Sequence, residues 1–308
     1  KPRTPAAFDA PQIGTFLHFL LEHVTRDVLS LGGFARTDQD TLHALVRKYI
    51  DEYVQKELRN FQNRNARFRY LFARLRNTAY AVVDQAAEEL RHSDFTPLAF
   101  ELSFGDGKEA DIPSVVISEP DGELRVGGKV DRVDGWFKDG RIYLRVVDYK
   151  SGKKSFDLAA VRMGLDIQML LYLFALQKTG ASRFGGEIEP AGVLYLPARD
   201  DILSAERNIP PDRLQAEREK QLRRSGLLLA EPQVLQAMEH EALKQPRYLP
   251  LRVNKNGDIS GSLASAAQLG KLGRYVETLL HDISREIRQG NIDADPCCHR
   301  ENDVPCQY

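Results

Sequence analysis

The sequence predicts an α/β protein in which a short mixed β-sheet is flanked by helices, with further helical segments at both ends. Strand-like runs fill the middle of the chain, and apolar residues recur at helical spacing on both sides of them. Such an order is typical of a sheet covered by helices. We expect a single domain over residues 1–308, with a helical part at 1–95, a sheet core at 96–200 and a helical part at 201–308.

Composition is that of an ordinary globular chain, because 42% of the 308 residues are hydrophobic and 28% are charged. No apolar run approaches the roughly 20 residues that span a bilayer, and no signal peptide precedes the first helix. We therefore expect a soluble cytoplasmic protein without a membrane partner. The net charge of −1 does not indicate a nucleic-acid binder, so any DNA contact must come from local patches.

The first expected helix covers residues 12–30, where apolar residues recur every three or four positions. On its other face His18 and Glu22 lie one turn apart. The simplest interpretation of His18 is a partly buried, hydrogen-bonded histidine; the alternative is a metal ligand.

Two more helices are expected at residues 39–60 and 64–92, and the chain around their junction is basic. Seven positive residues between Lys56 and Arg76 alternate with aromatic rings, as in a track for single-stranded nucleic acid. The alternative is a solvated helix face whose rings turn into the core. The candidate DNA contacts are Arg64, Arg67, Arg69 and Arg74.

Alternating or β-branched runs predict the sheet, and apolar periodicity predicts the helices after it. The expected strands are 97–104, 112–118, 124–133, 142–150 and 191–196, with one helix at 157–179 between the last two. That crossover makes strands 142–150 and 191–196 parallel. Helices are then expected at 213–224, 227–245 and 263–289, with a turn at 255–258.

The chemistry is concentrated at the ends of strands 124–133 and 142–150. Asp148 and Lys150 share a strand face, and Asp131 joins them if residues 136–140 turn the chain back as a hairpin. Close carboxylates favour a hard divalent cation between them, which predicts a magnesium site. The alternative is a solvated strand edge, which is the commoner meaning of a single Asp-x-Lys pair. Gln168 and Tyr172 follow on one helix face.

Three cysteines, Cys297, Cys298 and Cys306, fall within the last twelve residues. This distribution fits neither a disulfide scaffold nor scattered core thiols and suggests a terminal metal or cluster site. The chain also begins without methionine, so we expect it to be part of a longer protein.

Five segments together resemble the RecB-type nuclease domain of the PD-(D/E)XK superfamily, and most closely the C-terminal nuclease domain of the B subunit in bacterial AddAB helicase–nucleases. The segments are IGTFLHFLLE, GGKVDRVD, VVDYKSGK, GLDIQMLLY and the terminal GNIDADPCC to PCQY. The resemblance covers nearly the whole chain and implies a restriction-endonuclease-like core.

The resemblance also implies roles for individual residues. Metal ligands would be His18, Asp131, Asp148 and the carbonyl of Tyr149, the catalytic lysine would be Lys150, and Gln168 and Tyr172 would support the site and the DNA. Glu22 and Glu101 remain candidates for a supporting shell.

The activity implied is Mg²⁺-dependent hydrolysis of DNA phosphodiesters, with Mn²⁺ as a substitute. The substrate would be single-stranded DNA or duplex ends, delivered by the motors of a helicase–nuclease that includes an A subunit. Such a complex processes double-strand breaks for recombinational repair. No Walker motif occurs in this chain, so ATP hydrolysis would come from elsewhere.

The family also carries a [4Fe–4S] cluster held by four cysteines, one ahead of the nuclease domain and three at its end. Cys306 matches the first of those three, whereas Cys297 and Cys298 have the wrong spacing. We expect the cluster in the full-length protein and not in this chain.

Two alternatives stay open. One is a DNA-binding scaffold that has kept the fold without cutting, although no motif here is broken. The other is a stand-alone Cas4-type nuclease, against which the helices after residue 200 argue.

Overall fold

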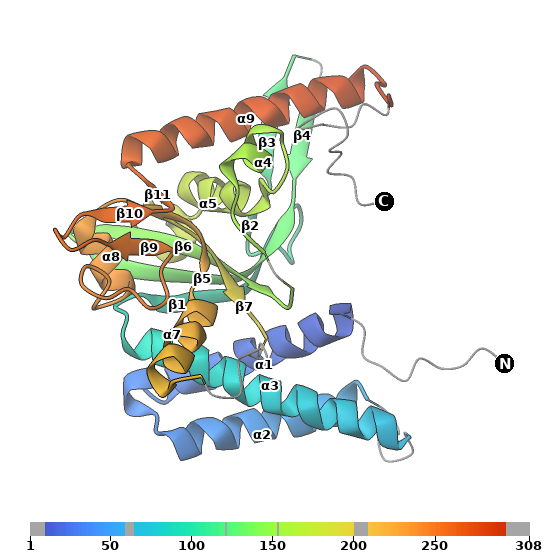
Figure 1. Cartoon of the computed structure of the whole chain (residues 1–308). Helices are drawn as coiled ribbons and strands as arrows, with labels where there is room; N and C mark the ends of the chain where they lie inside the picture. The colour runs from blue at the N-terminus through green and yellow to red at the C-terminus, as the bar shows by residue number, and fades with distance from the viewer. Residues whose placement is uncertain (1–9, 59–64, 121, 153, 200–208, 294–308) are drawn as a thin grey trace.

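A mixed β-sheet lies at the centre of the molecule, with helices on both of its faces (Figure 1). The computed structural model describes residues 10–58, 65–120, 122–152, 154–199 and 209–293. Within these ranges the main sheet has seven strands in the order β11-β8-β7-β6-β5-β1-β2. The predicted fold class is confirmed, and strand β6, which carries Asp148 and Lys150, is the central strand.

Three long helices form the N-terminal layer: α1 (Ala10–Ser30), α2 (Gln39–Lys56) and α3 (Ala66–Arg91). A short 3₁₀ helix, Phe34–Arg36, lies between the first two. Asp38 and Asn65 cap α2 and α3 by accepting backbone N–H groups, which explains where these helices begin. Helix α1 contacts β1 and β6, so this layer covers one face of the sheet.

The sheet places the predicted strands as neighbours. Its members are β1 (Thr96–Gly105), β2 (Ile112–Pro113), β5 (Gly128–Lys138), β6 (Arg141–Lys150), β7 (Glu187–Pro197), β8 (Ser225–Leu229) and β11 (Leu263–Ala264). Strands β5 and β6 form the expected hairpin, but its turn is only Asp139–Gly140 because Trp136 and Phe137 still pair with β6. Strands β6 and β7 are parallel, as predicted.

Two of the expected strands are each divided between two sheets. Residues 112–118 and 124–133 do not run on through one sheet: β3 (Val115–Glu119) and β4 (Gly122–Val126) pair with each other as a separate hairpin. Alternation identifies extended backbone, but partners are chosen by tertiary packing. A second small hairpin joins β9 (Leu251–Val253) to β10 (Ile259–Gly261) around the predicted turn at 255–258.

The single helix expected at 157–179 is wrong. It is two helices, α4 (Leu158–Arg162) and α5 (Gln168–Thr179), followed by a short α6 (Ala181–Phe184). Gly164 and Asp166 between α4 and α5 have φ of 77° and 55°, in the left-handed region that no α-helix continues through. Helix α5 packs on β6 and β7, on the face away from α1.

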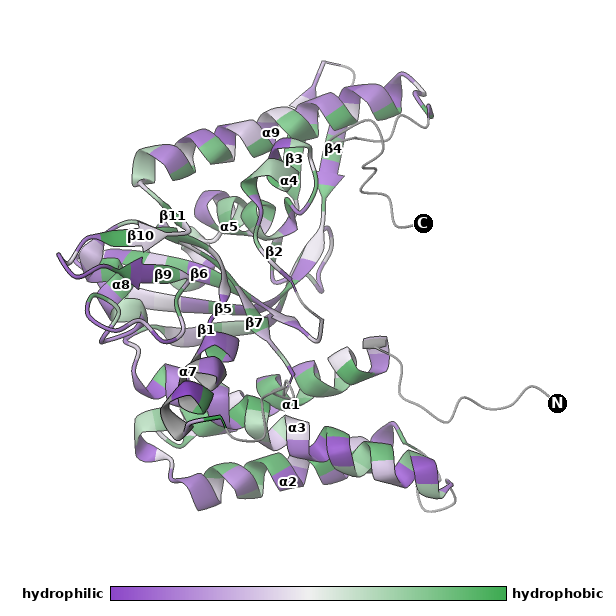
Figure 2. Ribbon diagram, viewed as in Figure 1, coloured by the Kyte–Doolittle hydropathy of each residue, from purple (hydrophilic) through white to green (hydrophobic). Residues whose placement is uncertain are grey.

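The helix expected at 227–245 is also wrong, because its apolar first part is strand β8 and only α8 (Pro232–Met238) is helical. A short apolar run does not distinguish a buried strand from a helix. Helices α7 (Pro211–Leu222) and α9 (Ala266–Arg288) agree with expectation. Ser265 and Gln268 cap α9 reciprocally, and Figure 2 shows hydrophobic and hydrophilic residues alternating along it.

Across the described residues, none of the helices combines the length and apolarity needed to cross a membrane.

Candidate active site

The predicted site residues come from elements that meet where β6 ends. Helix α1 supplies His18, strand β5 supplies Asp131, and β6 supplies Asp148 and Lys150. The antiparallel pairing of β5 and β6 places the beginning of one strand beside the end of the other. Strand β1, paired with β5 on its other side, adds Glu101.

His18 bridges the helical layer and the sheet. Its Nε2 lies 3.1 Å from the carbonyl oxygen of Tyr149, and its Nδ1 lies 3.6 Å from Asp131 Oδ1. A neutral imidazole donates a hydrogen bond from one nitrogen and accepts at the other. With Nε2 as the donor to the Tyr149 carbonyl, Nδ1 can present its lone pair to a cation beside Asp131. The structure thus brings together three of the four predicted ligand groups, His18, Asp131 and the Tyr149 carbonyl.

Asp131 is a partly buried carboxylate, with 15% of its side chain exposed. Its Oδ2 accepts the N–H of Tyr149 at 2.8 Å. Burial, together with the negative charges of Asp148 and Glu101, raises the pKa of Asp131 to about 6 against the opposing effect of His18. A bound cation would favour the ionised form that these surroundings disfavour.

Glu101 belongs to the same group, although the sequence indicated it only weakly. Among the described residues, the side chains whose ligand atoms all lie within 4.8 Å of one another are His18, Glu101 and Asp131. Glu101 has a φ of 50°, a backbone conformation that costs about 1–3 kcal/mol and recurs at functional sites. The available signal was that Glu101 is the one charged residue in the strand TPLAFELSFG. Glu22, the other candidate, instead pairs with Arg26 at 3.0 Å.

Asp148 and Lys150 form a pair of their own at the edge of this group. Lys150 Nζ lies 2.6 Å from Asp148 Oδ2, and both side chains point to one face of β6 as alternation predicts. Asp148 is 8% exposed, whereas the Lys150 side chain is 36% exposed. The lysine therefore presents a cation towards solvent beside the carboxylates.

Gln168 and Tyr172 brace the beginning of β5. Gln168 Nε2 donates to the Tyr172 hydroxyl at 2.9 Å, and that hydroxyl accepts the N–H of Lys129 at 3.3 Å. The Tyr172 ring stacks on Phe104 with centroids 5.4 Å apart. A Cβ at Gly128 would lie 2.4 Å from the Tyr172 hydroxyl, so glycine is required for this close approach. The pair thus contacts the strand that carries the Asp131 carboxylate.

The arginines of α3 are separate from this site. Arg67, Arg69 and Arg74 are exposed, whereas Phe68 and Phe72 are buried, so most of the described rings turn into the core. Tyr70 is the exception at 63% exposure. Arg64 and the cysteines Cys297, Cys298 and Cys306 lie outside the described residues.

The donor set suits a hard divalent ion. Carboxylates and a backbone carbonyl are the oxygen ligands that Mg²⁺ accepts, usually with water completing the shell. Asp131 and Glu101 supply the carboxylates, Tyr149 supplies the carbonyl, and Asp148 lies close enough to Asp131 to raise its pKa.

Comparison with known proteins gives one answer along the whole chain. The profile of the PD-(D/E)XK nuclease superfamily matches residues 1–308. The B subunit of the ATP-dependent helicase/deoxyribonuclease from Acetivibrio thermocellus is 32% identical over 312 residues, which cover 100% of this chain and 27% of the relative. The corresponding B subunits of Ruminiclostridium cellulolyticum and Clostridium perfringens are 33% and 30% identical, over 93% and 100% of this chain and 25% and 27% of theirs.

The chain thus spans about a quarter of the length of the curated relatives it matches. The superfamily match confirms the resemblance expected from the motifs, and it agrees with the mixed sheet flanked by helices. The chain belongs to the PD-(D/E)XK nuclease superfamily.

Proposed function

We propose that this chain is a Mg²⁺-dependent deoxyribonuclease that hydrolyses phosphodiesters of single-stranded DNA. The observation that carries the proposal is the convergence of His18, Glu101, Asp131 and the Tyr149 carbonyl beside the Asp148–Lys150 pair. Mn²⁺ has similar ligand preferences and would substitute for Mg²⁺.

The metal, when bound, would supply Lewis acidity and acidify a water molecule. His18, Asp131 and Tyr149 would hold it, with Glu101 and Asp148 completing or supporting the ligand set. Glu101 is itself held by Lys129, whose Nζ lies 2.8 Å from its Oε2.

Lys150 has the geometry for charge stabilisation. Its ammonium group, anchored on Asp148 and partly exposed, would contact a non-bridging oxygen of the scissile phosphate and offset the negative charge that develops there. Attack by water then breaks the bond between phosphorus and the 3′ oxygen, leaving a 5′-phosphate and a 3′-hydroxyl.

The wider role rests on the relatives, whose names describe the B subunit of an ATP-dependent helicase/deoxyribonuclease. We infer that this chain is the nuclease part of such a complex, supplied with DNA by helicase motors and an A subunit during double-strand-break repair. A cytoplasmic location follows from that role.

The test is degradation of labelled single-stranded DNA with Mg²⁺ by wild type, Asp148→Ala and Lys150→Ala. Lys138→Ala is the matched control, because Lys138 lies at the far end of the same hairpin, where it pairs with Asp139. We expect loss of activity in the first two variants and full activity in the control. Equal activity in all four proteins would refute the assigned roles.

The iron–sulfur prediction needs its own experiment. Iron and sulfide would be measured in this chain and in a version extended at both ends. We expect a [4Fe–4S] cluster only in the extended protein, with Cys306 among its ligands; a stoichiometric cluster in the shorter chain would contradict this.

A further inference from the structure

A hollow opens beside the candidate site and shares Lys150 with it. This hollow, which we call the basic groove, has a volume of about 370 Å³, within the lower range of ligand pockets. Its walls are the loop after β6, the end of β7 and the last two turns of α7, which lies near the end of β7 (Figure 1). Residues of β6, β7, α7 and β8 and of the segments between them therefore meet in one place.

The charge of the groove is predominantly positive. Among its described lining residues one is acidic, Glu217, and five are basic: Lys150, Lys154, Arg199, Lys220 and Arg223. The hollow between α5, α9 and β3, by contrast, is lined mainly by apolar side chains such as Leu171, Phe174 and Leu280. Of these two hollows, the basic groove has the chemistry to hold an anion.

The ion pairs of Lys154 and Lys220 leave these two lysines available to a stronger anion. Lys154 pairs with Asp166, and Lys220, whose side chain is 70% exposed, pairs with Glu217 at 2.5 Å. Exposed pairs of this kind contribute little to stability. A phosphate, with several acceptor oxygens, can replace these carboxylates at low cost.

The segment that carries Arg223 is held in place by the contacts of the next two residues. The next residue, Arg224, is buried and donates to Glu89 of α3 at 2.8 Å, and Ser225 accepts the N–H of Phe156 at 2.7 Å. A basic surface that keeps its shape before the ligand arrives loses less entropy on binding.

We propose that the basic groove binds the DNA backbone phosphate adjacent to the scissile one, through Lys154, Lys220 and Arg223. This inference rests on the proposed function and deepens it, because it assigns the path of the strand on one side of Lys150. The ring in the described lining, Tyr195, is 5% exposed and lies beneath Lys150, with Nζ 6.0 Å from its centroid. Contacts in the groove are therefore to phosphate and not to bases, and binding there is independent of sequence.

The experiment compares Lys220→Gln/Arg223→Gln with Arg213→Gln/Arg252→Gln. The control pair is also exposed and removes the same charge, with Arg213 on the same helix, but neither residue lines the groove. The probe is a fluorescent oligothymidylate of about 12 nucleotides, bound in EDTA so that no cleavage is required.

We expect the groove variant to bind about ten-fold more weakly, with the slope of log affinity against log salt reduced by about 0.7 for each phosphate that the variant no longer binds. KM for the oligonucleotide should rise while kcat changes less than about two-fold. The charge-conserving variant Lys220→Arg/Arg223→Lys should restore binding, and unfolding curves should be unchanged in all variants.

Equal affinity of the groove and control variants would overturn the proposal. Failure of wild type to cleave DNA would instead count against the proposed function, since the binding measurement does not depend on cleavage. The two results are therefore distinguishable.

Discussion

Strands β5 and β6 carry two clusters of charged side chains on opposite faces. Alternation puts Asp131, Asp148 and Lys150 on one face and Arg132, Asp134 and Arg145 on the other. The first cluster reaches solvent, and the second is sealed beneath α3. The same residue types thus serve two purposes on adjacent positions of the same strands.

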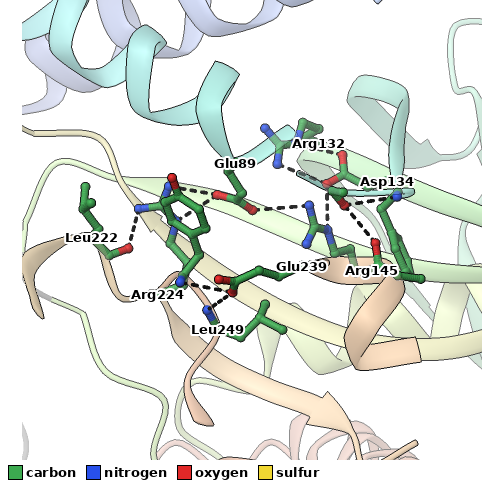
Figure 3. Close-up of polar contacts among 12 residues, drawn as sticks. Glu89, Arg132, Asp134, Arg145, Leu222, Arg224, Glu239 and Leu249 are labelled. Carbon is green, nitrogen blue, oxygen red and sulfur yellow. Dashed lines mark hydrogen bonds and ion pairs between the residues drawn. The ribbon is translucent and has the colours of Figure 1, made fainter. Parts of the chain in front are cut away.

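In the sealed cluster, shown in Figure 3, every charged side chain is paired with one of opposite sign. Arg145 donates to Asp134 at 2.8 Å and to Glu89 at 3.3 Å. Arg132 donates to Asp134 at 3.0 Å, and Arg224 donates to Glu89 at 2.8 Å. All five side chains are at most 3% exposed. Each buried charge has an opposite charge at hydrogen-bond distance, as a buried ionic group requires.

The candidate site lacks that complete pairing. Three carboxylates, Glu101, Asp131 and Asp148, face two lysines and His18, and the lysines pair with Glu101 and Asp148. Among the described residues, Asp131 has no lysine or arginine within ion-pair distance; its Oδ1 lies 3.6 Å from His18 Nδ1, and burial raises the pKa of Asp131 to about 6. A carboxylate held at a fixed position without a lysine or arginine partner indicates a ligand, whereas a network in which every charge is paired indicates architecture.

The two clusters are physically joined. Arg132 also donates to the hydroxyl of Tyr149 at 3.2 Å, while the backbone of Tyr149 contacts both His18 and Asp131. The sealed cluster therefore fixes the strand on which the site is assembled.

The same substitution on the two faces gives the largest expected contrast. Asp134→Asn leaves Arg132 without a carboxylate and Arg145 with Glu89 alone, and it should lower the free energy of unfolding by about 3–5 kcal/mol. Asp131→Asn keeps an acceptor for the Tyr149 N–H and should change it by less than about 1 kcal/mol. Nuclease activity should nevertheless fall at least about 100-fold in Asp131→Asn. Urea unfolding and cleavage assays measure both; equal destabilisation would place Asp131 in the structural network.

Lowering the pH should weaken the sealed cluster and with it the stability of the fold. Burial opposes ionisation of Glu89, but Arg224, Arg145 and Arg132 outweigh it and hold the pKa of Glu89 below its ordinary value. Ionised Glu89 therefore stabilises the fold above the ordinary pKa of about 4.3, and this stability is lost as pH falls through the lowered pKa. Glu89→Gln should cost about 3–5 kcal/mol at pH 7.

The measurement is urea unfolding of wild type and Glu89→Gln between pH 7 and low pH. The difference in the free energy of unfolding between wild type and Glu89→Gln should shrink below about pH 4. Glu88→Gln is the control, since the Glu88 side chain is 41% exposed and surface ion pairs such as its contact with Arg91 contribute little, so its effect on stability should stay near zero. A difference that grows on acidification would contradict the assigned charge state.

Bound metal should stabilise the protein through the candidate site and not through the sealed cluster. At a Mg²⁺ concentration about 100 times Kd, the free energy of unfolding of wild type, measured by thermal unfolding, should rise by about 2.7 kcal/mol. Asp134→Asn should keep this gain despite its lower stability, and Asp131→Asn should lose it. A gain retained by Asp131→Asn would show that the ion binds elsewhere.

The brace behind the site should have a smaller effect. Tyr172→Phe removes the hydroxyl that contacts Gln168 and the Lys129 amide, and it should cost about 1 kcal/mol of stability. Gly128→Ala forces the Tyr172 ring away and should lower activity about ten-fold. Gly270→Ala on α9, where a Cβ would meet Arg274 at an ordinary 3.8 Å, is the control. Full activity of Gly128→Ala would argue against the brace.

The arginines of α3 should matter least. Replacing Arg67, Arg69 and Arg74 by Gln should change stability by less than about 0.5 kcal/mol, because they are exposed. Their effect on oligonucleotide affinity should be smaller than that of the Lys220/Arg223 pair, since they do not line the basic groove. A larger effect would move the DNA path from the basic groove to α3.

Local pattern was sufficient for much of this molecule. The spacing of apolar residues located α1 and α9, and alternation placed Asp148 and Lys150 on one face of a strand. It failed at 227–229, where three leucines fit helix and strand equally, and at 164–166, where left-handed residues divide the expected helix. These outcomes depend on neighbours that are distant in sequence.

What the sequence determined by itself was the set of chemical groups and their local direction: His18 on a helix, Asp131 and Asp148 on strands, Lys150 beside Asp148. Only the tertiary structure decided that Glu101 joins them, that Arg132 and Asp134 are sealed from water, and that α7 brings Lys220 and Arg223 to the groove at Lys150. The physical reason is that side-chain direction follows from backbone periodicity within a few residues. Strand partners, burial and net charge at a point depend on the whole packed chain.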